Sequence, residues 1–223
     1  MTVPTDAIYG AAALVSYLVG AIPFGWLAAK LAKGVDLRTA GSGNIGATNA
    51  ARVLGTAWFP PIFALDFLKG FAPTFWLAPW VAARWPCPVC VSLEPTLMAT
   101  CGVAALAGHL LPVYLSFKGG KGVATGAGVV FALNWVAGAA AVAVWLAVFG
   151  ATRYVSLASV VAALTLPAAQ FLRKPADPVA RTINLALFVL LAAVVVWRHR
   201  DNLGRLKRGE EPRVRRPGAG GPS

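Results

Sequence analysis

The sequence predicts an all-α protein, a polytopic bundle of transmembrane helices. Of its 223 residues, 58% are hydrophobic and only 13% are charged, and the apolar residues form runs long enough to cross a bilayer. A soluble domain carries about twice that share of charged residues. The length suits one bundle of about six or seven helices and no second globular domain. We therefore expect a single integral membrane domain over residues 1–210, followed by a disordered basic tail rich in Pro and Gly over residues 211–223.

The first two predicted spans cover residues 7–31 and 56–83. The first is long enough for a hydrocarbon core of about 30 Å, and it contains Pro23, which membrane helices tolerate. Because the residues before it lack the basic region of a secretory leader, we expect it to be retained as a helix. The second span holds Asp66 and Lys69, three positions apart on one helix face. Charges are costly inside a membrane, so the two should pair or face the bundle interior.

The later apolar stretches cover residues 97–117, 123–150, 155–172 and 181–197. If residues 123–150 formed one span, the basic segments after it would all lie outside. A fold-back near Asn134 would instead give two short helices and return those segments to the inside. We therefore predict seven transmembrane helices, with two short ones over about residues 123–150, the N-terminus outside and the C-terminus cytoplasmic.

Charge and cysteine usage exclude several classes of partner. The net charge of +12 lies in short loops between apolar spans, which suits the lipid bilayer or an anionic substrate and not nucleic acid. Cys87 and Cys90 form a lone C-x-x-C, whereas a zinc site would need a second pair. Two free thiols or a loop disulfide both stay open. The eight acidic residues do not cluster as a Mg²⁺ site would require, so we expect no metal and no cofactor.

The stretch from Gly41 to Asn49, GSGNIGATN, is unlike any lipid-facing helix. Its glycines let backbone N–H groups turn toward a ligand, and its hydroxyl and amide side chains add donors. Thr48 or Asn49 would cap a helix entering at Ala50 and aim its positive end at the same point. The stretch predicts an anion site, most simply for phosphate, with a plain flexible loop as the alternative. Its G-x-G-x-x-G spacing is no dinucleotide fingerprint, because it follows a membrane helix rather than a strand.

Three further polar clusters fall on the same predicted side of the membrane. They are residues 118–122, Arg153 with Ser156, and residues 198–202. The first, KGGKG, fails the P-loop spacing, so it is either a basic loop with turn glycines or a second phosphate site. His199 suits a base or a phosphate ligand, and a basic cluster at a helix end is the alternative. His109, alone on an apolar helix, is expected to be structural.

One common acyltransferase signature is absent. The fifth residue after His109 is Tyr114 and the fifth after His199 is Gly204, so no H-x4-D pair exists. The usual His–Asp pair of acyltransferases with soluble substrates is therefore missing.

Five motifs span nearly the whole chain to about Glu210. In order they are GSGNIGATNAARVLG, DFLKG, GHLLPVYLSFKGGKGVAT, RYVSLAS and WRHRDNLGRL. Together they resemble the bacterial acyl-phosphate-dependent glycerol-3-phosphate acyltransferase family, with no departure at the motif positions. The resemblance implies a seven-helix enzyme of the cell inner membrane with a cytoplasmic active site. It would move an acyl chain from acyl phosphate to the sn-1 hydroxyl of glycerol 3-phosphate, giving lysophosphatidic acid and phosphate. This is the first acylation step of phospholipid biosynthesis, and it uses neither coenzyme A nor acyl carrier protein.

The chemistry of these side chains, together with the family resemblance, predicts a role for each candidate site residue. The Ser42 stretch would bind the donor phosphate, and Arg52 with the later clusters would hold glycerol 3-phosphate. Ser156 would donate a hydrogen bond to a phosphate. The predicted catalytic residues are Ser42, Lys121, His199 and Asn202. The predicted substrate-binding residues are Gly43, Asn44, Ile45, Gly46, Ala47, Thr48, Asn49, Arg52, Lys118, Gly119, Gly120, Ser156 and Arg200.

Two mechanistic alternatives concern Ser42 and His199. Ser42 is disfavoured as a covalent nucleophile because no base is adjacent to it in the sequence. The attacking hydroxyl would lose its proton to the donor's phosphate or to His199. The arginines flanking His199 disfavour a positive charge on its ring, which favours the phosphate.

Two rival functions remain. A transporter for a phosphorylated or anionic solute would also use broken helices and a cationic face. A lipid-headgroup transferase with a nucleotide-linked donor would need a carboxylate-bound metal, which the sequence does not provide. The sequence leaves the acyl-chain preference open. It also leaves the oligomeric state open, and a monomer is one of the possibilities.

Overall fold

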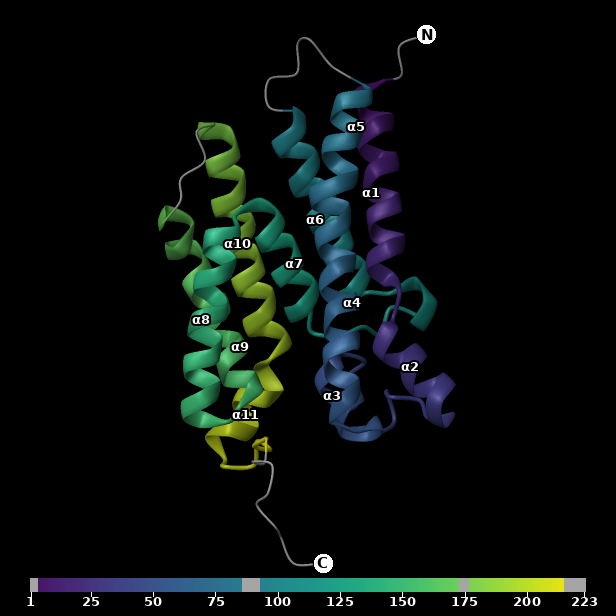
Figure 1. Cartoon of the computed structure of the whole chain (residues 1–223), viewed down its shortest axis with the longest axis vertical. Coiled ribbons are helices and arrows are strands. Elements are labelled where there is room, and N and C mark those ends of the chain that lie inside the picture. The colour runs from purple at the N-terminus through teal and green to yellow at the C-terminus, as the bar shows by residue number, and fades with distance from the viewer. Residues whose placement is uncertain (1–3, 86–92, 173–176, 215–223) are drawn as a thin grey trace, which may run out of the picture.

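The structure is a computed structural model and describes residues 4–85, 93–172 and 177–214. Throughout these ranges the regular elements are helices, with no strand. The helices form two groups that stand side by side (Figure 1). One group contains α1, α4, α5 and α6, and the other contains α8, α9 and α10, while α7 packs against both α4 and α8. Cys87 and Cys90 lie outside the described residues, so their pairing stays a prediction.

The first span is bent at Pro23. It consists of α1 (Thr5–Ala21) and α2 (Phe24–Lys33), and α1 packs along α6 (Leu93–Leu110). Glycines bring these two backbones into contact, because a Cβ on Gly20 would lie 2.0 Å from the Ala105 carbonyl oxygen. A Cβ on Gly108 would lie 2.2 Å from the Tyr17 carbonyl oxygen. Such close approach is typical of packed membrane helices.

The second span carries the buried ion pair. It follows α3 (Ala47–Leu54) and η1 (Thr56–Trp58), and runs through α4 (Phe59–Ala72), the π-type turn η2 (Pro73–Leu77) and α5 (Ala78–Arg84). Asp66 Oδ1 and Lys69 Nζ lie 2.7 Å apart and both side chains are buried, so their predicted pairing is confirmed. Lys69 also donates a 2.7 Å hydrogen bond to the carbonyl oxygen of Ile22, beside the bend at Pro23. The pair therefore joins the first two spans.

The predicted fold-back occurs at Asn134, between α7 (Val123–Leu133) and α8 (Trp135–Thr152). Asn134 has extended backbone, its Oδ1 accepts a 3.2 Å bond from Ala137 N, and its Nδ2 donates to Gln170 Oε1 at 2.8 Å. Only the first of the two helices is short. At about 16 Å, α7 is shorter than a hydrocarbon core of about 30 Å, whereas the 18 residues of α8 are long and apolar enough to cross one.

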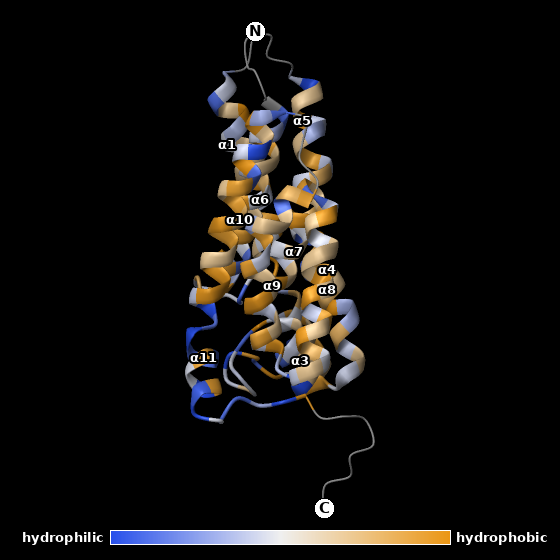
Figure 2. Ribbon diagram, turned by 90° about the vertical axis from the view of Figure 1, so that its left-hand side faces the viewer, coloured by the Kyte–Doolittle hydropathy of each residue, from blue (hydrophilic) through white to orange (hydrophobic). Residues whose placement is uncertain are grey.

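The remaining elements complete the bundle. They are η3 (Val113–Leu115), α9 (Val155–Ala169), η4 (Gln170–Leu172), α10 (Pro178–Arg198) and α11 (Arg200–Lys207). Five helical segments of the described ranges are long and apolar enough to cross a membrane. Figure 2 shows their apolar middle and the hydrophilic α11 beside one end. The count of seven spans and their orientation stay predictions.

The chain after α11 returns to the loop that follows α8. Val214 N donates to the Arg153 carbonyl oxygen at 3.0 Å, and Arg213 Nε donates to the Tyr154 hydroxyl at 2.9 Å. Glu211 is only 7% exposed. Composition predicts disorder from residue 211, but residues 211–214 pack against the bundle through these contacts. Residues 215–223 lie outside the described ranges.

Candidate active site

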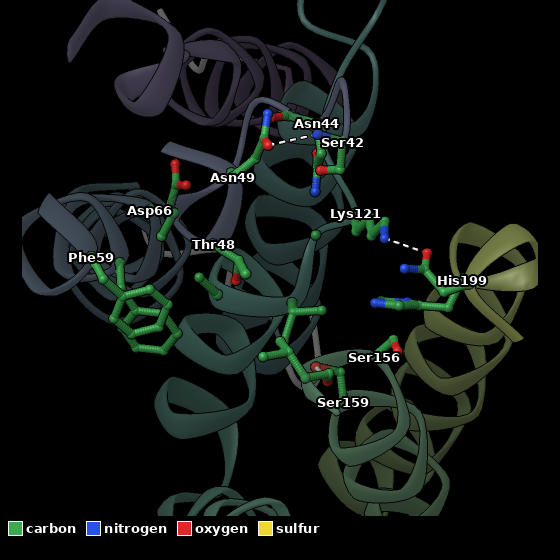
Figure 3. Close-up of a pocket in the computed structure, with 18 of the residues that line it drawn as sticks. Ser42, Asn44, Thr48, Asn49, Phe59, Asp66, Lys121, Ser156, Ser159 and His199 are labelled. Atoms are coloured by element: carbon green, nitrogen blue, oxygen red, sulfur yellow. Dashed lines mark hydrogen bonds between the residues drawn. The ribbon is translucent and has the colours of Figure 1, made fainter. Parts of the chain in front are cut away.

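A polar cavity of about 120 Å³ opens where α3, the loop before α7, the start of α9 and the α10–α11 junction meet (Figure 3). All four polar clusters singled out from the sequence contribute to its wall. The predicted site residues that line it are Ser42, Asn44, Gly46, Ala47, Thr48, Asn49, Arg52, Lys121, Ser156, His199 and Asn202. The predicted convergence of these segments is therefore present in the geometry.

Asn49 holds the glycine-rich loop together. Its Oδ1 accepts a 2.8 Å bond from Ser42 N, and its Nδ2 donates to the carbonyl oxygens of Ala40 at 2.9 Å and Asn44 at 2.8 Å. Asn49 is 1% exposed. A Cβ on Gly41 would lie 2.3 Å from Asn49 Oδ1, so only glycine fits there.

The predicted helix cap at Thr48 or Asn49 is wrong. The N-cap of α3 is Gly46, with no side-chain cap bond, and both residues already lie in its first turn. The side chain of Asn49 is committed to the loop, while Thr48 faces the pocket (Figure 3). The helix N-terminus still points at the pocket, as an anion site requires.

The loop before α7 is clamped from two sides. Gly120 N donates to the His109 carbonyl oxygen at 3.1 Å. From the other side, Arg198 Nε donates to the Gly120 carbonyl oxygen at 3.0 Å and Arg198 Nη2 to that of Gly119 at 2.9 Å. A Cβ on Gly120 would lie 2.2 Å from His109 Nε2. The two glycines therefore serve close packing, and the clamp positions the next residue, Lys121.

Lys121 follows these glycines in the loop and places its positive charge in the pocket wall. Its ammonium group donates to Asn202 Oδ1 (Figure 3). Burial lowers the pKa of Lys121 to about 8, and the nearby arginines act in the same direction, while Glu211 opposes them. Lys121 is therefore still charged near neutral pH, and a bound phosphate would favour that charge further.

Glu211 is a site residue that sequence reasoning missed. Its Oε1 accepts 2.7 Å bonds from Ser156 Oγ and from Asn202 Nδ2, and its Oε2 accepts a 2.9 Å bond from Arg205 Nε. Burial alone would raise the pKa of Glu211, but these three hydrogen bonds outweigh it and the pKa lies below its usual value. The signal was the pair of acidic residues, Glu210 and Glu211, in a mostly basic tail.

The Glu211 contact also changes what Ser156 offers. Its hydroxyl proton points at the carboxylate, so toward the pocket Ser156 presents lone pairs. The expected donation from Ser156 to a phosphate is not the hydrogen bond that this structure contains.

His199 faces the pocket as a neutral acceptor. Its Nδ1 lies 2.8 Å from the carbonyl oxygen of Val195, and because a carbonyl can only accept, Nδ1 carries the proton. Nε2 is then left with a lone pair, and the ring is directed toward Lys121 (Figure 3). Burial and the Lys121 charge lower the pKa of His199 to about 4, so the ring is uncharged at neutral pH.

Some predicted site residues do not line the pocket. These are Gly43, Ile45, Lys118, Gly119, Gly120 and Arg200. Arg200 is exposed and stacks on Trp197, with its guanidinium carbon 4.8 Å from the ring centroid. Conversely, Asp66, expected to pair or face the bundle interior, and His109, expected to be structural, do line it, with Asp66 Oδ1 3.9 Å from His109 Nδ1.

An apolar cavity of about 300 Å³ adjoins the polar pocket, and Phe131, Leu166 and Leu191 contribute to its wall. The two cavities share wall residues from four helices and the Lys121 loop: Phe59, Phe63, Gly122, Val123, Trp145 and Ser159. Metal ligands do not gather in either place, since the described ranges hold no group of three or more His, Cys, Asp or Glu side chains suited to an ion.

Residues 10–209 match the family model described as glycerol-3-phosphate acyltransferase. The chain belongs to the glycerol-3-phosphate acyltransferase family. A glycerol-3-phosphate acyltransferase of Aquifex aeolicus is 43% identical over 89% of this chain and 95% of that protein. One of Prochlorococcus marinus (strain MIT 9211) is 39% identical over 90% of this chain and 91% of that protein.

Solved structures agree with the family assignment. The crystal structure of PlsY (YgiH), an integral membrane glycerol 3-phosphate acyltransferase, in its glycerol 3-phosphate form matches with a TM-score of 0.79 and 39% identity, over 93% of this chain and 96% of that one. Its lysophosphatidic acid form matches with a TM-score of 0.78 and 38% identity, over 93% and 95% of the two chains. This acyltransferase is therefore an integral membrane enzyme, and the family and all-helical class predicted from the sequence are confirmed.

Proposed function

We propose that this glycerol-3-phosphate acyltransferase takes its acyl chain from acyl phosphate and places it on the sn-1 hydroxyl of glycerol 3-phosphate. The products are lysophosphatidic acid and inorganic phosphate. The observation that carries the proposal is the shared wall between a cationic pocket and an apolar cavity. A donor with a phosphate head and a hydrocarbon chain fits that pair.

The donor phosphate would lie at the glycine-rich loop. The backbone N–H groups of Gly46, Ala47 and Thr48, which line the pocket at the N-terminus of α3, suit a leaving group that gains negative charge. An acyl phosphate is a mixed anhydride with a good leaving group, so it needs little help from a strong base. This is consistent with the absence of an H-x4-D pair.

The acceptor would lie across the pocket. Arg52 and Lys121 would hold the phosphate of glycerol 3-phosphate, and His199 Nε2 would accept a hydrogen bond from its hydroxyl. That hydroxyl oxygen attacks the acyl carbon, the carbon–oxygen bond to phosphate breaks, and the departing phosphate takes the proton. A His199 pKa of about 4 makes the ring a weak base, which favours the phosphate as proton acceptor.

The enzyme would lie in the cell inner membrane with the pocket facing the cytoplasm. Support comes from the distribution of basic residues, because Arg52 and Lys121 line the pocket and Arg205 pairs with Glu211 in its wall.

Phosphate release from the purified protein tests the proposal. We expect release only when acyl phosphate and glycerol 3-phosphate are both present, with lysophosphatidic acid formed in equal amount. Flux of glycerol 3-phosphate into liposomes without product would instead establish a transporter. If His199→Gln abolished turnover while leaving glycerol 3-phosphate binding unchanged, His199 would be the base.

A further inference from the structure

The apolar cavity runs lengthwise from the phosphate pocket into the bundle. On α7, Val123 lies at the polar end, Gly126 one turn further and Phe131 furthest in. From Val123 to Phe131 the axial rise is about 12 Å.

Two neighbouring helices show the same order. On α9 the lining residues run from Ser159, shared with the polar pocket, to Leu166. On α8, which runs the opposite way, they run from Trp145 back to Gly138. A volume of about 300 Å³ lies within the range of cavities that enclose a ligand.

Gly126 stands midway along this cavity. A Cβ at this position would meet only Leu191 Cδ2, at 3.4 Å, which is an ordinary contact. Its neighbour Gly128 differs, because a Cβ there would lie 2.1 Å from the Phe67 carbonyl oxygen. The backbone thus requires glycine at 128 but not at 126, where the missing side chain leaves space inside the cavity.

Phe131 and Gly138 close the far end. A Cβ on Gly138 would lie 2.6 Å from the Phe131 ring, so the glycine lets that ring lie flat against α8. The same ring contacts Phe67 edge-on at 5.6 Å between centroids.

We propose that Gly126 determines the acyl-chain length that this enzyme accepts, by keeping the cavity open between the reacting carbonyl and the Phe131 end. The inference rests on the proposed acyl phosphate donor. A side chain at 126 would occupy the volume that the acyl chain fills beyond its first few carbons. Each methylene group expelled to a polar or strained position lowers the rate of transfer by about fourfold.

The test is a series of acyl phosphates from four to eighteen carbons, assayed with the wild type, Gly126→Leu, Gly126→Ala and Ala139→Leu. Ala139 is exposed on α8 and does not line the cavity, so Ala139→Leu is the matched control for added volume. For Gly126→Leu we expect kcat/KM with the longest donors to fall by about tenfold to a hundredfold. A four-carbon donor, whose chain ends before it reaches Gly126, should change by less than about threefold, and the KM for glycerol 3-phosphate should stay unchanged.

Gly126→Ala adds one carbon at a position with room for it, so it should fold and show the same trend at about fourfold. Equal loss at every chain length in both Gly126 variants, or the wild-type profile in both, would overturn the inference while leaving the donor established. If the wild type transfers from no acyl phosphate, the proposed donor and this inference both fall.

Discussion

Lys121 donates its hydrogen bond to Asn202, a residue 81 positions later in the chain, and this bond joins the two halves of the pocket. Asn202 in turn donates to Glu211, so the cation and the carboxylate share one amide between them. Each side chain is thereby held in place before any substrate arrives, which suits a site that must orient glycerol 3-phosphate.

The charge on Lys121 predicts an alkaline limit to substrate binding. With a pKa of about 8, Lys121 loses its proton as the pH rises through 8, so the KM for glycerol 3-phosphate should rise above that pH. Lys121→Ala should raise this KM about tenfold to a hundredfold at pH 7, because a hydrogen bond to a charged group is lost. Lys121→Arg keeps the charge and should remove the alkaline rise. Steady-state kinetics from pH 6 to 9.5 check both, and an unchanged KM in Lys121→Ala would contradict the assignment.

Glu211→Gln should move that alkaline limit to lower pH. The Glu211 carboxylate favours the protonated form of Lys121, so removing its charge lowers the Lys121 pKa further. The measurement is the same KM profile. Glu210→Gln is the control, because Glu210 is exposed and pairs with Arg208 at 2.7 Å outside the pocket. Identical profiles for the two variants would show that Glu211 has no electrostatic role.

His199 predicts an acid-dependent loss of stability. Its pKa of about 4 in the folded enzyme lies below the unfolded value of 6.5, so the unfolded chain takes up the proton first. Stability should therefore fall by up to about 3 kcal/mol as the pH drops from 6.5 to 4. Thermal unfolding in detergent should show a flatter pH dependence for His199→Gln than for the wild type. Parallel curves would be inconsistent with a buried neutral His199.

Arg198 clamps the Lys121 loop, so its loss should weaken substrate binding although Arg198 itself does not line the pocket. Arg198→Ala removes two hydrogen-bonded supports from the loop carbonyls, so the KM for glycerol 3-phosphate should rise about tenfold with a smaller change in kcat. Arg198→Lys should recover part of the loss. The exposed Arg208→Ala serves as a control for lost charge. A fall in kcat at constant KM would contradict the view that Arg198 acts through glycerol 3-phosphate binding.

The Asp66–Lys69 pair predicts an asymmetric response to mutation. Asp66→Asn leaves a buried ammonium group without its partner and should destabilise the enzyme by about 3–5 kcal/mol. Replacing both residues by apolar ones of similar volume should cost less than the single change. Thermal unfolding of the three proteins tests this order, and a double variant less stable than Asp66→Asn would contradict it.

Polar residues in an apolar chain carried most of what the sequence could predict. Such residues are expensive in lipid, so the Asp66–Lys69 pair followed from that cost. The gathering of the polar clusters around one pocket followed from their predicted placement on one side of the membrane. The break at Asn134 followed from charge balance across the membrane. The length of α8 did not, because hydropathy cannot divide an unbroken apolar run between two helices.

The sequence-based predictions of the site were least accurate for the glycine-containing loops and for the C-terminal tail. A glycine pair next to a lysine is compatible with anion binding and with close packing, and only the contacts of Gly119 and Gly120 with His109 and Leu110 distinguish the two. In the same way, the sequence allows Asn49 either to cap helix α3 or to support the glycine-rich loop, and only its contacts distinguish the two. Glu211 lies in a basic, Pro-rich sequence whose order depends on three partners from other elements, and no local pattern encodes those partners.

The return of the chain after α11 has a practical consequence for anyone who shortens this protein. A chain cut after residue 210, where hydropathy and motif matching both suggest an end, would keep every predicted catalytic side chain. It would nonetheless lose the carboxylate that fixes Ser156 and Asn202, along with the backbone bond from Val214 to Arg153. Such a protein would insert into membranes normally and show little activity. Purification tags therefore belong after residue 214, and a low yield of activity from shorter versions should be attributed to the missing residues before the membrane environment is blamed.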